Sequence, residues 1–297
     1  NLQARFFRRS AGEFFAFLFE ICHAEPPLFA LNMQYYYLMS SLPDLSSESP
    51  FLSEIGALVE HIEENLAPGD LKYFRYLLYK NDNKNLIYQL RLREGIRDPS
   101  YLTFFEPSAY TFEELEMHIK DSEDLPAYMQ AFLEACGRDE LPADWRLREN
   151  LLKERYYQEA LQLKDSFLRA YFSFKRSLKN ILSALNARQY GFPLAEVLIG
   201  HDDLTAQLSR ATQSDFGLSR EFPFIDELRQ YIADKSFVKL EQTVDLLLLR
   251  KVQELALDRF SRGAVFAYFI EATLLQRWIH LEEKAGAQEL ERMMHRI

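Results

Sequence analysis

The sequence has few residues that make turns or cross-links. Its 297 residues include ten glycines, eleven prolines and two cysteines, against 24 Phe and 16 Tyr. Because large aromatic side chains fill the space between helices and turn formers are scarce, the composition predicts an all-α fold. Cys22 and Cys136 stand far apart and belong to no motif, so we expect no disulfide framework and favour a reducing, cytoplasmic compartment.

Basic residues are fewer than acidic ones, 35 against 45, and long apolar runs are scarce. The net charge of −10 argues against a generally basic surface for nucleic acid. The most apolar stretch, residues 264–279, is interrupted by Glu271 and Arg277, whereas a membrane span needs roughly 20 apolar residues in a row. We therefore expect no nucleic acid partner and no transmembrane span.

Signatures of nucleotide and metal sites are missing as well. The sequence contains no GxxxxGK[ST] loop, no GxGxxG loop, no CxxC pair and no HExxH motif. A di-iron helical bundle needs two Glu-x-x-His motifs, and only the one from Glu20 to His23 is present. These absences argue against nucleotide hydrolysis by this chain and against the commonest metal sites.

The histidines and serines form no recognisable catalytic arrangement. His61 and His280 stand beside glutamates, a setting that suits a metal or a tuned general base. Acidic runs on helices are nevertheless typical of solvated faces, which is the interpretation adopted here. The segment Gly217–Leu218–Ser219 lacks the second glycine of a nucleophile elbow. The sequence thus predicts no catalytic residue, no cofactor, no metal and no small-molecule substrate.

The longest helical pattern runs from Ser166 to Gly191. One side is apolar, through Phe167, Tyr171, Phe174, Leu178, Ile181, Leu182 and Leu185. The other side is basic, through Arg169, Lys175, Arg176, Lys179 and Arg188. We interpret the basic side as solvated or salt-bridged, with an acidic partner or lipid headgroups as the alternative. Gly191 is expected to end the helix in the left-handed conformation.

This helix has two alternative lengths. With Asp144 as N-cap it spans about 45 residues and about 65 Å. The alternative is a single break near Lys164.

Other segments predict further helices, separated by glycine, proline or polar clusters. They cover residues 52–66, 70–80, 86–93, 111–120, 125–136, 194–199, 203–211, 224–233, 237–260, 264–283 and 287–297. Asp70 is expected to cap the second of these, and Thr111 with Glu114 to form a capping box at the start of the fourth. Residues 81–85, rich in asparagine, are expected to interrupt the second, and Gly286 to precede the last. The segment 35–42 is either a short strand or a first helical turn.

The first 32 residues differ from the rest of the chain. A basic start precedes an apolar stretch, as in a signal peptide, but Glu13 and Glu20 interrupt that stretch. We interpret residues 1–32 as an N-terminal extension or an upstream mis-start before Met33, and residues 33–297 as one helical domain.

Four segments give the chain a resemblance to a known family. They are YYYLMSSLPDLS at 35–46, NILSALNARQYG at 180–191, SDFGLS at 214–219 and VFAYFIEATLLQRWIHLEEKAG at 265–286. From Met33 onward the chain resembles the bacterial V-type ATPase C-subunit-like family, which is related to the central-stalk component known as C or d.

The resemblance implies a function as well as a fold. It implies a funnel-like bundle of long helices, cytoplasmic and peripheral to the inner membrane, that is not an enzyme. Such a protein couples the rotating shaft of a V/A-type ATPase to the membrane proteolipid ring, so that ATP hydrolysis in its partners drives H⁺ or Na⁺ transport. In the loop SDFGLS, Asp215 and Phe216 are candidate partner-binding residues, with an ordinary helix connection as the alternative.

Two other functions remain open at this stage. The first is a cytoplasmic helical adaptor or scaffold without ATPase involvement. The second is a helical metalloenzyme whose ligands lie far apart in the sequence.

Overall fold

The described part of the chain is helical throughout. The computed structural model describes residues 35–45, 54–96, 104–121, 124–138 and 140–294, with side chains up to residue 278. These residues form twelve α-helices and no strand, which confirms the predicted all-α fold. Residues 1–32, with the Glu20–His23 motif, lie outside the described residues. No helix among the described residues is long and apolar enough to cross a membrane.

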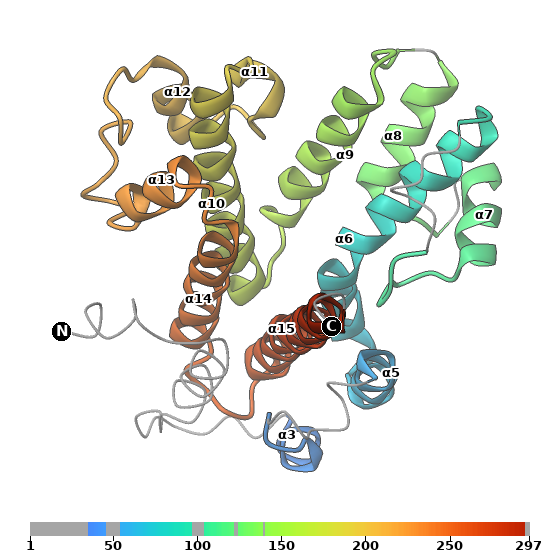
Figure 1. The fold of residues 1–297 in the computed structure, drawn as a ribbon. Coiled ribbons are helices and arrows are strands. Elements are labelled where there is room, and N and C mark those ends of the chain that lie inside the picture. Colours follow the sequence, from blue (N-terminus) through green and yellow to red (C-terminus); the bar gives the residue numbers. More distant parts are fainter. Residues whose placement is uncertain (1–34, 46–53, 97–103, 122–123, 139, 295–297) are drawn as a thin grey trace. The chain divides into compact units, whose positions relative to one another are not determined.

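The chain divides into two compact units, one made of residues 1–71 and 248–297 and the other of residues 72–247. In the first unit, α15 (Arg262–Met294) packs against α3 (Tyr36–Ser41) and α5 (Ile55–Asn65). For the segment 35–42 the sequence allowed a short strand or a helical turn. The structure has the helix α3 there (Figure 1). The side chains of α15 that form the core include Val265, Phe266 and Phe269.

Asp70 ties three segments of the first unit together. It lies in the first turn of α6 (Pro68–Arg93), so the prediction that it caps this helix is wrong. Its carboxylate accepts hydrogen bonds from the Tyr35 hydroxyl, at 2.5 Å, and from the Arg262 guanidinium. A buried carboxylate needs such partners, because burial without them costs several kcal/mol.

The helix α6 continues without a break through residues 81–85, so the predicted interruption is wrong. Asparagine favours turns only when its side chain bonds to nearby backbone. Here the polar side chains bond to a distant segment instead. Asn85 is fully buried; its amide nitrogen donates to the Phe105 carbonyl at 3.0 Å and its oxygen accepts from the Phe105 N–H at 2.8 Å.

Three more side chains of α6 hold the same connection. Asn81 donates to the Pro107 carbonyl at 2.9 Å, and Gln89 donates to the Phe112 carbonyl at 2.9 Å. Asp82, fully buried, accepts from the backbone N–H groups of Ala109 and Tyr110 at 2.9 and 3.2 Å. Side chains on one face of α6 therefore supply hydrogen-bond partners to the backbone of residues 105–112.

The helices α7 (Phe112–Asp121) and α8 (Ala127–Gly137) follow as predicted. The capping box at Thr111 is confirmed, because the Thr111 N–H donates to Glu114 at 2.8 Å and the Glu114 N–H donates to the Thr111 hydroxyl at 3.2 Å.

An aromatic core joins α6, α8, α9 (Trp145–Ala160) and α10 (Ser166–Tyr190). The rings of Tyr128 and Tyr156 lie 5.6 Å apart, and those of Tyr156 and Phe172 lie 5.5 Å apart. The buried hydroxyls are paired, since Tyr128 donates to Asn83 at 2.9 Å and Tyr156 donates to the Tyr76 carbonyl at 2.7 Å. Paired hydroxyls let tyrosines fill a core without an orphaned polar group.

The pattern over 144–190 forms two helices, so the continuous 45-residue helix is wrong and the break near Lys164 is confirmed. Asp144 caps α9 and accepts from the Arg146 N–H at 2.8 Å. Asp165 caps α10 and accepts from the Leu168 N–H at 2.7 Å. The second cap explains the break, because an N-cap carboxylate satisfies the orphan amides of a new helix start. The expected left-handed glycine at Gly191 is also present, at φ 75°.

The remaining helices are α11 (Leu194–Val197), α12 (Asp203–Arg210), α13 (Ile225–Ala233) and α14 (Phe237–Leu255). The prediction that Gly286 precedes a separate last helix is wrong, since α15 runs through it to Met294. A glycine inside a helix costs only about 1 kcal/mol, which neighbouring helix formers offset.

Asn85 is a direct test of the connection at 105–112. We expect Asn85→Ala to lower the free energy of unfolding by about 2 kcal/mol, because it removes both hydrogen bonds that Asn85 makes with the Phe105 backbone in a buried place. Urea unfolding measures this change. Asn65→Ala is the matched control, since exposed Asn65 donates only to the His61 carbonyl within its own helix. Equal losses in the two variants would contradict the assigned role.

Asp82 makes stability depend on pH. Burial raises the pKa of its carboxyl to about 7, although the N–H groups of Ala109 and Tyr110 act in the opposite direction. A carboxyl whose pKa is higher in the folded than in the unfolded state stabilises the fold at low pH. That stability is lost as the pH rises from about 4 to 7.

Substitution of Asp82 isolates its share of that pH dependence. We expect the free energy of unfolding of the wild type to fall more steeply over this pH range than that of Asp82→Asn, as measured by urea unfolding in a pH series. Parallel curves would show that Asp82 is not responsible.

Candidate partner-binding site at the end of helix α10

The helix α10 holds together the helices that follow it in the second unit. The helices α11, α12 and α13 each pack against it, and Figure 1 shows α11 and α12 beside one of its ends. The connections between these helices approach the basic side of α10. That side is therefore largely used within the fold.

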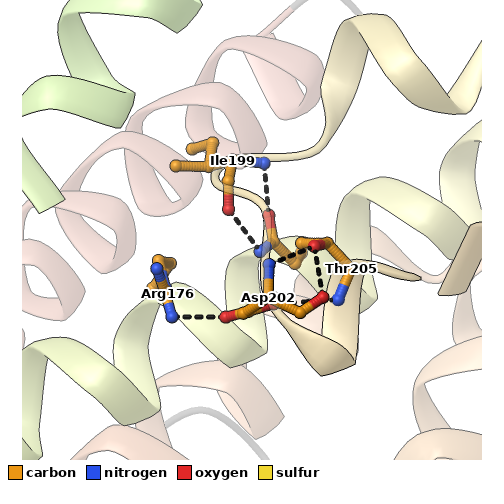
Figure 2. Close-up of polar contacts among 5 residues, drawn as sticks. Arg176, Ile199, Asp202 and Thr205 are labelled. Atoms are coloured by element: carbon orange, nitrogen blue, oxygen red, sulfur yellow. Dashed lines mark hydrogen bonds and ion pairs between the residues drawn. The ribbon is translucent and has the colours of Figure 1, made fainter. Parts of the chain in front are cut away.

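Asn180 fixes the first of these connections. It is fully buried, its amide nitrogen donates to the Ile199 carbonyl at 2.9 Å, and its oxygen accepts from the Ile199 N–H at 2.8 Å (Figure 2). This is the same two-bond arrangement that Asn85 makes with Phe105. A single helical side chain again satisfies both backbone groups of a loop residue.

The same connection is also held by an ion pair. It joins Asp202, in the connection, to Arg176, which lies one turn before Asn180 on α10. One carboxylate oxygen of Asp202 accepts from the Thr205 N–H at 2.9 Å and so caps α12. The other accepts from the Arg176 guanidinium (Figure 2). Gly200 lies between these contacts at φ 87°, and a Cβ there would stand 3.1 Å from an Arg176 nitrogen, so the site requires glycine.

The loop SDFGLS lies against the C-terminal end of α10. Phe216 is fully buried at φ 57°, and the Arg188 guanidinium carbon lies 3.6 Å from its ring centroid. Arg188 also donates to the carbonyls of Ala211 and Gln213. Phe216 therefore anchors this loop in the fold, and its ring is not available to a partner in this structure.

Asp215 is half-buried, and both of its carboxylate oxygens serve the loop. They accept from the Ser219 hydroxyl and from the Gly217 N–H, the latter at 3.0 Å. These hydrogen bonds hold the pKa of the Asp215 carboxyl below its usual range. A partner-binding role for Asp215 stays a prediction.

Two exposed aromatic side chains follow Arg188 at the C-terminal end of α10. Tyr190 ends α10 with 45% of its surface exposed, and Phe192 follows Gly191 with 53% exposed. Their ring centroids lie 6.4 Å apart. Aromatic side chains are enriched at protein interfaces relative to the rest of the surface. We call Tyr190 and Phe192 the aromatic pair.

Sequence reasoning missed the aromatic pair. Tyr190 lies outside the apolar stripe of α10, and Phe192 lies beyond the helix, so neither was assigned to the core or to a site. Large side chains on both sides of a helix-ending glycine were the available signal.

The structure offers no metal centre in the part of the chain that it describes. No three potential ligands from His, Cys, Asp and Glu gather there. The His61 ring nitrogen lies 3.0 Å from the Ser41 hydroxyl. The side chain of His280 lies outside the described ones.

Comparison with protein families gives one match over most of the chain. Residues 32–297 match the model of a family described as protein of unknown function, DUF2764. The chain belongs to the DUF2764 family. The resemblance to the V-type ATPase C-subunit-like family is therefore wrong, since the matching model is that of DUF2764 and none of the ATPase stalk family matches. This DUF2764 protein matches no curated protein and no solved structure.

Asn180 provides the test of how this region is held. We expect Asn180→Ala to lower the free energy of unfolding by about 2 kcal/mol, because Ile199 loses both backbone partners in a buried place. Asn186→Ala is the matched control, since Asn186 on the same helix donates only to the Leu182 carbonyl of its own helix. Thermal and urea unfolding measure both. A loss no larger than that of the control would contradict the role given to Asn180.

Proposed function

We propose that this DUF2764 protein is a non-catalytic helical adaptor that binds a partner protein through the aromatic pair at the end of α10. The observation that supports this most strongly is the exposure of Tyr190 and Phe192 on a firmly held base. Gly191 ends α10 between the two aromatic residues, and Arg188 ties the adjoining loop to that end. Rigid aromatic side chains bind at low entropic cost, since little freedom remains to be lost.

The backbone around the aromatic pair is held in place by side chains of α10 and of the neighbouring loop. A fixed surface of this kind suits an adaptor better than a flexible one. Asn180 and Arg176 fix the connection before α12, and Phe216 fixes the one after it. Satisfied polar networks of this kind hold one arrangement of the backbone. The aromatic pair is thus presented in a single geometry, which favours specific over general hydrophobic contact.

The narrower function predicted from the sequence was a coupling component between the shaft and the proteolipid ring of a rotary ATPase. Its argument was a resemblance that the family match overturns, so the adaptor function leads. The stalk function stays a prediction that differs in the identity of the partner. In either case we place the chain in the cytoplasm, because the sequence favours reduced cysteines.

The experiment compares the proteins that co-purify with the full chain when the aromatic pair is present and when it is substituted. A tagged chain is purified in gentle detergent from its native cells, as wild type, as Tyr190→Ser with Phe192→Ser, and as Met117→Ser. Met117 is the matched control, because 55% of its surface is exposed and it lies on α7 in the same unit. We expect the double variant to keep its melting temperature and to lose a protein that both other forms retain.

The identity of that protein separates the two versions of the function. P-loop ATPase proteins together with a small proteolipid would support the stalk function, and any other protein would support the adaptor. If wild type and double variant retained the same proteins in the same amounts, the aromatic pair would not be the binding surface.

A further inference from the structure

Several tyrosines of the second unit form an unbroken series of neighbouring rings. We call them the tyrosine series: Tyr76, Tyr79, Tyr110, Tyr128, Tyr156 and Tyr157. The ring centroid of Tyr79 lies 5.2 Å from that of Tyr76, 6.3 Å from that of Tyr110 and 6.4 Å from that of Tyr128. The Tyr156 centroid lies 5.6 Å from that of Tyr128 and 5.3 Å from that of Tyr157. Every member therefore has another phenol ring beside it, and the branches meet at Tyr79.

Such a series can carry an oxidation through the unit. A phenol ring loses a single electron far more readily than a phenylalanine or aliphatic side chain does. Between neighbouring rings at these separations, an electron crosses in a short step. Because the rings are chemically alike, moving the electron vacancy from one to the next changes the energy little. The surroundings of each hydroxyl therefore determine where the oxidation comes to rest.

The hydroxyl partner matters because a phenol that has lost an electron becomes a strong acid. A neutral radical persists only where a base takes the hydroxyl proton. Three members of the series donate to amide oxygens, which are poor bases: Tyr110 to the Asp124 carbonyl at 2.8 Å, Tyr128 to Asn83 at 2.9 Å, and Tyr156 to the Tyr76 carbonyl at 2.7 Å. These positions can pass an oxidation on but cannot hold it.

Tyr76 differs from them, because its hydroxyl donates to the Glu159 carboxylate at 2.5 Å. The other oxygen of Glu159 accepts from the Tyr128 N–H at 2.8 Å, in the first turn of α8, where the helix favours negative charge. Burial and the hydrogen bond to Glu159 raise the pKa of the Tyr76 hydroxyl. The proton therefore stays on Tyr76 until an electron leaves, and a carboxylate within hydrogen-bond reach is then its acceptor.

One end of the series approaches the surface at α7. His118 on that helix is half-buried, and its ring centroid lies 5.3 Å from that of Tyr110. Tyr110 and Tyr79 are themselves buried. An oxidant at α7 would therefore meet the series at Tyr110, with Tyr79 between that residue and Tyr76.

We propose that the tyrosine series conducts one-electron oxidation from the surface at α7 to Tyr76 and that a tyrosyl radical forms there. A one-electron oxidant at α7 takes an electron from Tyr110 and is reduced. An electron then passes from Tyr79 to Tyr110 and from Tyr76 to Tyr79, while the Tyr76 hydroxyl proton moves to Glu159. The products are a neutral Tyr76 radical, a neutral Glu159 carboxyl group and the reduced oxidant. This activity does not depend on the proposed adaptor function, because it uses none of the aromatic pair.

The test places an oxidant at α7 and looks for the radical at the other end. In the full chain with Cys22→Ser and Cys136→Ser, a ruthenium polypyridyl complex is attached to the thiol of Met117→Cys. Met117 suits the label because 55% of its surface is exposed and it adjoins His118. A light flash with a soluble cobalt(III) ammine as electron acceptor oxidises the ruthenium. Electron paramagnetic resonance of samples frozen after the flash measures the tyrosyl radical.

We expect a tyrosyl radical in the labelled chain and about tenfold less of it, or still less, in Tyr76→Phe and in Glu159→Gln. Glutamine keeps the shape of Glu159 and can still accept from the Tyr128 N–H, but it cannot take the proton. Tyr79→Phe should lower the yield as well, because it removes the step between Tyr110 and Tyr76. Tyr110→Phe replaces Tyr79→Phe if that variant fails to fold, as checked by thermal unfolding.

The matched control is Tyr231→Phe. Tyr231 is buried on α13 and its hydroxyl donates to Glu227 at 2.9 Å, so it has a carboxylate partner but is not a member of the series. We expect this variant to leave the radical yield unchanged. A wild-type yield in Tyr76→Phe or in Glu159→Gln would overturn the proposal. So would a loss in Tyr231→Phe as large as the one in Tyr76→Phe, or the absence of a radical in the labelled chain.

Discussion

The structure depends on one constraint. The N–H and C=O groups of the connections between helices need hydrogen-bond partners when they are buried. The second unit consists of helices joined by connections that have no regular ladder of their own. The buried side chains Asn85 and Asn180 each satisfy both backbone groups of a loop residue, Phe105 and Ile199. An unsatisfied buried amide or carbonyl costs about 1–3 kcal/mol, which is a large part of the stability of a domain. The connections are thereby fixed as firmly as the helices that hold them.

The same hydrogen bonds also determine which apolar side chains are exposed at the end of α10. The C-terminal end of α10 carries Arg188, whose bonds to the carbonyls of Ala211 and Gln213 leave Phe216 enclosed beneath it. Among the described residues, the large apolar side chains left outward at that end are those of the aromatic pair. The proposed adaptor function uses this exposed pair and no catalytic group.

The sequence predicted the features that depend on local chemistry. The all-α fold, the caps at Thr111 and Asp144 and the glycine end at Gly191 are set by residues within one turn, and the structure contains them. It did not predict features that depend on distant partners. Asn81 to Asn85 resemble a turn until Phe105 and Ala109 are known to lie beside them. Phe216 is a candidate contact residue in the sequence, but in the structure it is buried against Arg188, nearly thirty residues away. The family resemblance was wrong; the four short segments on which it rested contain no catalytic signature.

The most direct measurement of this constraint is amide hydrogen exchange in the full chain. Amides bound by helical side chains in the connections, those of Phe105, Ala109 and Ile199, should exchange as slowly as amides inside α6 and α10, because opening them requires the packed helices to separate. Exchange at the rate of unprotected loop amides would contradict the claim that the connections are fixed. A rigid base for the aromatic pair would then have no support.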